Sequence, residues 1–61
     1  MKAKDLIKLL EKNGWYQVRQ TGSHRIFKHP TKLETIPIPD HGKQDLKIGT
    51  LNAILKQAEL K

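Results

Sequence analysis

The sequence predicts an α+β fold, a two-layer αβββα sandwich in which two helices cover one face of a three-stranded antiparallel sheet. Apolar residues recur at helical spacing near both ends of the chain, and the middle holds short strand-like segments separated by turn residues. Two amphipathic helices and a small sheet can bury their apolar faces only against each other. With 61 residues, residues 1–61 are expected to form one domain.

The first element is an amphipathic helix. Its apolar residues recur at helical spacing between lysines: Leu6, Ile7, Leu9 and Leu10. Asn13-Gly14 follows, and a glycine just past the last helical residue is a common left-handed cap. The pattern predicts a helix over about residues 3–13.

Segments rich in β-branched and aromatic residues predict strands at 15–20, 24–29 and 34–39. A three-residue turn, 21–23, makes the first two strands a hairpin. Pro30 ends the second strand because it has no N–H to donate. Pro37 and Pro39 predict that the third strand lies at an edge of the sheet or is partly irregular, with Ile36 and Ile38 on one face.

A polar loop over residues 40–46 leads to a second helix. Its predicted apolar stripe consists of Ile48, Leu51, Ile54, Leu55 and Ala58. Gly49 weakens the first turn of this helix. The complete order, αβββα, is that of double-stranded-RNA-binding domains, although element order alone does not determine function.

The chain is strongly basic, with 12 Lys and Arg against 6 Asp and Glu and a formal net charge of +6. Such an excess on a small domain favours a polyanionic partner such as RNA. A lysine-rich surface that serves only solubility, or one that docks an acidic protein, would have the same composition.

Several classes of protein are excluded. The absence of cysteine excludes disulfides and thiolate metal sites. No apolar run approaches the roughly 20 residues of a membrane span, and the pattern after Met1-Lys2 is not that of a signal peptide. We therefore expect a cytoplasmic protein without membrane association. No cofactor is expected, because so small a domain offers no room for a dinucleotide crevice.

The segment from Thr21 to Arg25 is the most informative for chemistry. Gly22 allows close approach of the backbone, and free N–H groups of a Gly22-Ser23 turn can bind phosphate. His24 follows as a candidate base for the ribose 2′-hydroxyl. The candidate RNA contacts are Gly22, Ser23, Arg25, Lys28, Lys43 and Lys47. An ordinary surface histidine at the start of a strand is the competing interpretation.

The other polar and aromatic candidates point to simpler roles. His24, His29 and His41 have no metal-ligand spacing, and neither Asp40 nor Glu34 completes one, so no metal site is predicted. Ser23 lacks an arranged acid that would support a nucleophile. Trp15 and Phe27 are expected in the core rather than stacked on bases. Because side chains alternate along a strand, His24 and Ile26 share a face. If Ile26 is buried under the helices, His24 must lie at the end of the sheet.

The chain resembles the HicA toxin family over nearly its whole length. The resemblance rests on Gly14-Trp15-Tyr16 after the first helix, on Gly22-Ser23-His24-Arg25-Ile26-Phe27 with His29-Pro30, on Ile36-Pro37-Ile38-Pro39 with His41-Gly42, and on Gly49-Thr50-Leu51 through Ile54-Leu55 to Gln57-Ala58. The chain departs from the family at Lys47-Ile48, where many relatives have proline-lysine.

This resemblance implies a fold like the double-stranded-RNA-binding domain and a type II toxin that cleaves messenger RNA. It also implies inhibition by a HicB-type antitoxin and a catalytic role for His24. The resulting hypothesis is a metal-independent endoribonuclease (an mRNA interferase). The acid that protonates the leaving group is unassigned among His29, His41 and Lys28. A non-catalytic double-stranded-RNA-binding module and a protein-interaction domain are the alternatives.

Overall fold

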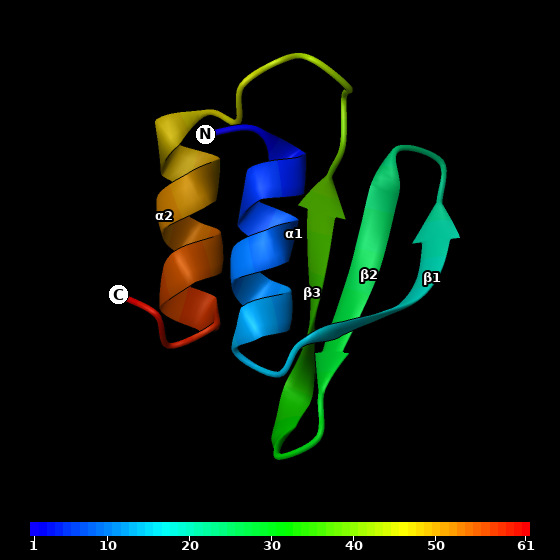
Figure 1. Cartoon of the computed structure of the whole chain (residues 1–61), viewed down its shortest axis with the longest axis vertical. Coiled ribbons are helices and arrows are strands. Elements are labelled where there is room, and N and C mark those ends of the chain that lie inside the picture. Colours follow the sequence, from blue (N-terminus) through cyan, green and yellow to red (C-terminus); the bar gives the residue numbers. More distant parts are fainter.

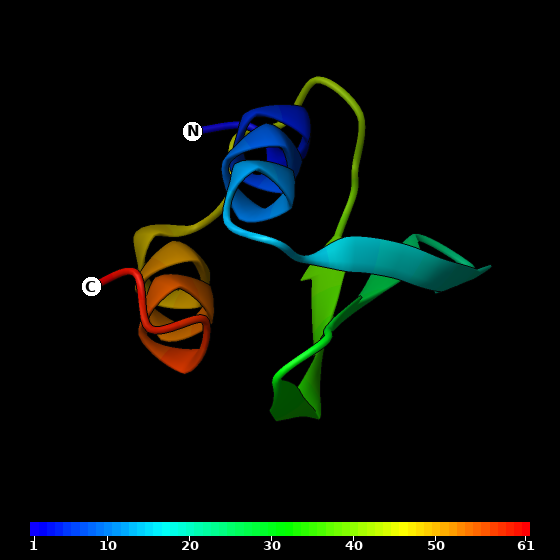
Figure 2. The same ribbon diagram turned by 60° about the horizontal axis from the view of Figure 1, so that its bottom comes forward.

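A computed structural model describes residues 1–61, and its elements follow in the order α1 (Ala3–Lys12), β1 (Tyr16–Thr21), β2 (His24–His29), β3 (Lys32–Pro39) and α2 (Ile48–Gln57). The strands form one antiparallel sheet in the order β1-β2-β3. Both helices lie on one side of this sheet (Figure 1 and Figure 2). The predicted α+β fold is confirmed, and so is the edge position of the proline-containing strand β3.

The core lies between the helices and the inner face of the sheet. Phe27 of β2 is fully buried there, as are its register partner Ile36 and Ile38 of β3. Trp15 is 2% exposed, so the prediction that Trp15 and Phe27 belong to the core is confirmed. The remaining buried residues come from the two helices and the residue after α2: Ala3, Leu6, Leu10, Ile54 and Ala58.

The burial of Phe27 settles which way β2 faces. Since side chains alternate along a strand, Ile26 and His24 point away from the helices. Ile26 is only partly buried, so it does not lie under the helices. His24 is therefore on the open face of the sheet as well as at the end of β2.

Both hairpins have tight two-residue turns. Thr21 pairs with His24, which leaves only Gly22-Ser23 in the first turn, so the prediction of a three-residue turn was wrong. Gly22 has a φ of 58°, and a glycine at the first turn position is typical of a type II′ hairpin. The second turn is Pro30-Thr31, because His29 pairs with Lys32. This is why β3 begins at Lys32, two residues before the predicted start.

The end of α1 matches the predicted glycine cap. The Trp15 N–H donates to the Leu10 carbonyl at 3.0 Å, and the Gly14 N–H donates to the Glu11 carbonyl at 3.1 Å. These two bonds are the Schellman pattern, and Gly14 takes the required positive φ, 95°. The cap directs Trp15 into the core, so β1 begins at Tyr16.

The start of α2 differs from the predicted apolar stripe. Ile48 is 75% exposed, whereas Ile54 and Ala58 are buried. Ile48 precedes Ile54 by six residues, which places it about 120° around the helix. It therefore lies at the margin of the apolar stripe, and it is the first residue of the helix. Neither helix is long and apolar enough to cross a membrane.

Candidate active site

One end of the molecule gathers the turn before β2, the loop after β3 and the starts of both helices (Figure 1). The Asp40 N–H donates to the Ser23 carbonyl at 2.7 Å, which ties the loop to the turn. The Leu46 N–H donates to the Met1 carbonyl at 2.9 Å, which ties the loop to the start of α1. Segments far apart in the sequence thus form one continuous surface.

His24 lies at this end on the open face of the sheet. Its register partners are Thr21 on β1 and Pro39 on β3. The side chain is exposed, and its ring takes no part in the side-chain hydrogen bonds of the protein. Both ring nitrogens are therefore accessible to a substrate.

Arg25 points the opposite way, toward the helices. Its Nε donates to Asp40 Oδ2 at 2.7 Å, and Asp40 Oδ1 accepts from the Gly42 N–H at 3.1 Å. The Gly42 N–H and the Arg25 guanidinium, with a further contribution from His41, hold the pKa of the Asp40 carboxyl below its usual range, against the opposing effect of partial burial. This clasp fixes the loop after β3 beside His24.

His29 occupies the far end of β2 on the helix side of the sheet. Its Nε2 donates to the Asn13 carbonyl at 3.0 Å, and its Nδ1 accepts from the Thr31 N–H at 3.2 Å. The ring also packs edge-on against Trp15, with centroids 5.2 Å apart. Both ring nitrogens are thus used to join the end of α1 to the second hairpin turn.

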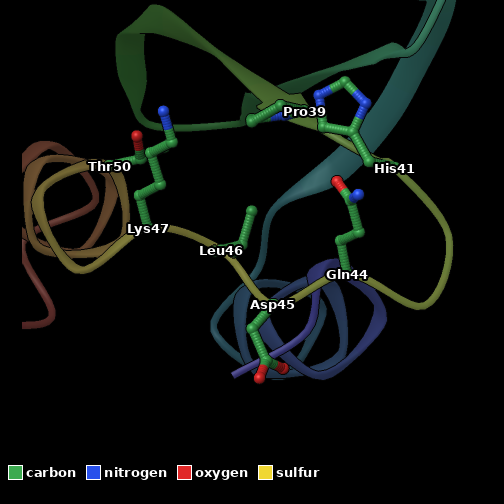
Figure 3. Close-up of a pocket in the computed structure, with 7 residues that line it drawn as sticks. All are labelled: Pro39, His41, Gln44, Asp45, Leu46, Lys47 and Thr50. Atoms are coloured by element: carbon green, nitrogen blue, oxygen red, sulfur yellow. The ribbon is translucent and has the colours of Figure 1, made fainter.

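His41 lies in the loop after β3 and lines a groove of about 270 Å³. Figure 3 shows its ring beside Pro39, with Gln44 and Lys47 lining other parts of the groove. His24 does not line this groove, but its register partner Pro39 does. The groove therefore adjoins the end of the sheet that carries His24.

The predicted lysines fall into three places. Lys28 shares the open face with His24, four residues along β2 and so about 13 Å away. Lys47 lines the groove with His41. Lys43 lines a separate hollow on the helix side with Arg25. The structure brings Gly22 and Ser23 next to His24 and turns Arg25 away from it.

A sequence model of the family described as the HicA toxin of bacterial toxin–antitoxin systems matches residues 3–60. The chain belongs to the HicA toxin family. A HicA toxin has a cognate antitoxin as its partner, so membership of this family implies an antitoxin partner for this chain. Among curated proteins, no match to the chain is found.

Sequence reasoning missed three basic residues of this HicA-family chain that lie near the predicted RNA contacts. Arg19 is the register partner of Ile26 and so shares the open face with His24. A two-residue turn would have predicted this pairing, whereas the assumed three-residue turn concealed it. Lys2 and Lys4 line the hollow on the helix side with Lys43, which no local pattern indicates. No group of three or more metal-ligating side chains lies together in the fold.

Proposed function

We propose that this HicA-family chain is an endoribonuclease that cleaves messenger RNA with His24 as its single catalytic histidine. It acts as the toxin of a type II system and is held inactive by a HicB-type antitoxin. The observation that carries the proposal is the contrast between two histidines of β2. Both ring nitrogens of His29 are bonded within the protein, whereas the exposed ring of His24 is bonded to nothing.

In the proposed reaction, the unprotonated nitrogen of His24 accepts the proton of a ribose 2′-hydroxyl. The 2′-oxygen forms a bond to the adjacent phosphorus, and the bond from phosphorus to the 5′-oxygen breaks. The products are a 2′,3′-cyclic phosphate and, once the leaving oxygen is protonated, a 5′-hydroxyl. General base catalysis of this kind contributes about 10²–10⁴-fold, so a single histidine makes a slow enzyme.

The acid that protonates the leaving oxygen is best sought in the loop after β3. His29 is five residues from His24 along β2, about 17 Å, and faces the helices. His41 follows two residues after Pro39, the register partner of His24, and is exposed at the adjoining groove. We assign this role to His41, ahead of Lys28.

Positive charge around the turn would hold the phosphate. Gly22 and Ser23 offer backbone N–H groups at the turn. Lys28 on the open face, Lys47 at the groove and Lys43 at the hollow on the helix side are exposed cations. Cations near the reacting phosphate stabilise the charge that develops on its oxygens. Arg25 is expected to act by holding Asp40 and its loop, since its Nε is already paired.

The test is cleavage of a messenger RNA by the purified chain, beside His24→Ala, His41→Ala and the remote variant Lys12→Gln. We expect His24→Ala to bind RNA with unchanged affinity and to lose cleavage by at least 100-fold, at the lower end of the range for a general base. Fragments from the active chain should end in cyclic phosphates. Cleavage by His24→Ala at the parental rate would refute the assignment. RNA binding by the parent without any cleavage would favour a non-catalytic double-stranded-RNA-binding module.

A further inference from the structure

The face of the sheet opposite the helices is uncovered and carries a defined set of side chains. Along β2, His24, Ile26 and Lys28 point outward, because Phe27 between them is buried under the helices. Register places Arg19 beside Ile26 and Tyr16 beside Lys28 on the same face. Figure 2 shows both helices on the other side of the sheet.

This open face is cationic and free of carboxylates. Arg19 and Lys28 are exposed on it together with His24. The acidic side chains lie elsewhere. Asp5 and Glu11 are on α1, and Asp40 and Asp45 are in the loop before α2. Glu34 of β3 and Glu59 line a hollow beside the end of α2. The face therefore complements a partner that is uniformly negative, such as a polyanion, rather than a partner surface of mixed charge.

The same face also carries apolar and aromatic side chains. Val18 and Ile26 line a shallow hollow on it together with Arg19, Lys28 and Thr35, and Val18 is 44% exposed. Val18 and its neighbour Arg19 share this face because the pairing register of β1 shifts between Gln17 and Arg19, where a bulge interrupts the alternation. Tyr16 is 47% exposed next to Lys28. A duplex hides the faces of its bases, whereas a single strand exposes them for stacking on aromatic and apolar side chains. Cations interleaved with apolar groups thus favour single-stranded RNA.

The proposed chemistry requires the same kind of substrate. The 2′-oxygen must approach phosphorus from the side opposite the leaving 5′-oxygen, and a base-paired helix holds the linkage out of this alignment. An unpaired linkage can rotate into alignment beside His24. This step rests on the proposed function, whereas the charge and shape of the face do not.

We propose that a single-stranded segment of RNA lies across the open face, with phosphates on Arg19 and Lys28 and a base stacked on Tyr16. The segment runs along β2 toward His24, where the reacting linkage lies. Lys28 is about 13 Å from His24 along the strand, so this face holds the nucleotides on one side of the cut.

The experiment measures binding of a single-stranded RNA oligonucleotide and of its duplex to the non-cleaving His24→Ala protein at several salt concentrations. A double variant, Arg19→Gln with Lys28→Gln, is compared with Lys8→Gln plus Lys12→Gln, which removes two exposed charges from α1 instead. Each phosphate contact to a single strand contributes about 0.7 to the slope of log affinity against log salt. We expect the slope to become shallower by about 1.4 in the open-face variant and to stay unchanged in the α1 variant.

A separate pair of variants tests stacking. Tyr16→Ala should weaken single-strand binding about fivefold or more, and Tyr16→Phe should retain it. Equal losses in the open-face and α1 variants, or tighter binding of the duplex with no loss in the open-face variant, would overturn the proposal. Loss of antitoxin binding with RNA binding intact would assign the face to the antitoxin and overturn it as well. These experiments measure binding and not cleavage. A failure of the open-face proposal is therefore distinguishable from a failure of His24 as the catalytic base.

Discussion

Gly14 is the position at which the structure makes its sharpest stability prediction. The residue has a φ of 95°, and a Cβ added there would lie 2.7 Å from His29 Nε2. Gly14→Ala therefore combines a left-handed backbone penalty of about 1–2 kcal/mol with a steric conflict. To relieve the conflict, the His29 ring must leave its hydrogen bond to the Asn13 carbonyl, which costs about another 1 kcal/mol.

Gly42→Ala is the matched control, because Gly42 also has a positive φ, 70°, but a Cβ there meets nothing within 4 Å. Thermal unfolding followed by circular dichroism should place the melting temperature of Gly14→Ala about 4–8 °C below that of Gly42→Ala, the shift expected for 1 kcal/mol in a domain of this size. In a His29→Ala background the extra cost should disappear. Equal costs at the two glycines, or an extra cost that survives without His29, would refute the steric part of the reasoning.

Three further predictions concern the core, the loop clasp and the phosphate contacts. Phe27→Ala should lower the free energy of unfolding by about 3–5 kcal/mol, a large part of the total of about 3–9 kcal/mol for a chain of this length. Urea unfolding followed by circular dichroism measures the loss, and a loss below about 1 kcal/mol would contradict the burial of Phe27. Because the pKa of Asp40 is lowered in the folded state, its ionisation stabilises the fold above the ordinary aspartate pKa, and that stability is lost as pH falls through the lower folded value. Urea unfolding from pH 6 to pH 3 should therefore lose less stability in Asp40→Asn than in the parent, and parallel profiles would contradict the clasp. Lys43→Gln with Lys47→Gln should weaken RNA binding and reduce its salt dependence; an unchanged salt dependence would remove both lysines from the interface.

Most of the fold was predictable from local patterns. The α1 period and Asn13-Gly14 predicted the helix and its cap, and Pro30, Pro37 and Pro39 predicted where strands end and which strand lies at an edge. These signals are local, because a missing N–H or a left-handed glycine acts on its own backbone. The strand from 24 to 29 was predicted with the bounds that the structure shows.

The parts that were not predictable depend on long-range geometry. The exposure of Ile48 depends on where α2 meets the sheet, and the length of the first turn depends on the pairing of Thr21 with His24. The candidate site shows the same division. His24 and its turn were found from the sequence, whereas the clasp between Arg25 and Asp40 joins residues fifteen apart, and the open-face position of Arg19 follows only from register.

The most direct test of the central claim is growth and RNA integrity in bacteria in which this chain is induced without an antitoxin. His24→Ala is expressed beside it at matched protein level. We predict growth arrest with loss of messenger RNA in the parent alone, reversed by co-expression of its HicB-type antitoxin. Arrest and RNA loss of equal extent with His24→Ala would contradict the claim that His24 performs the cleavage.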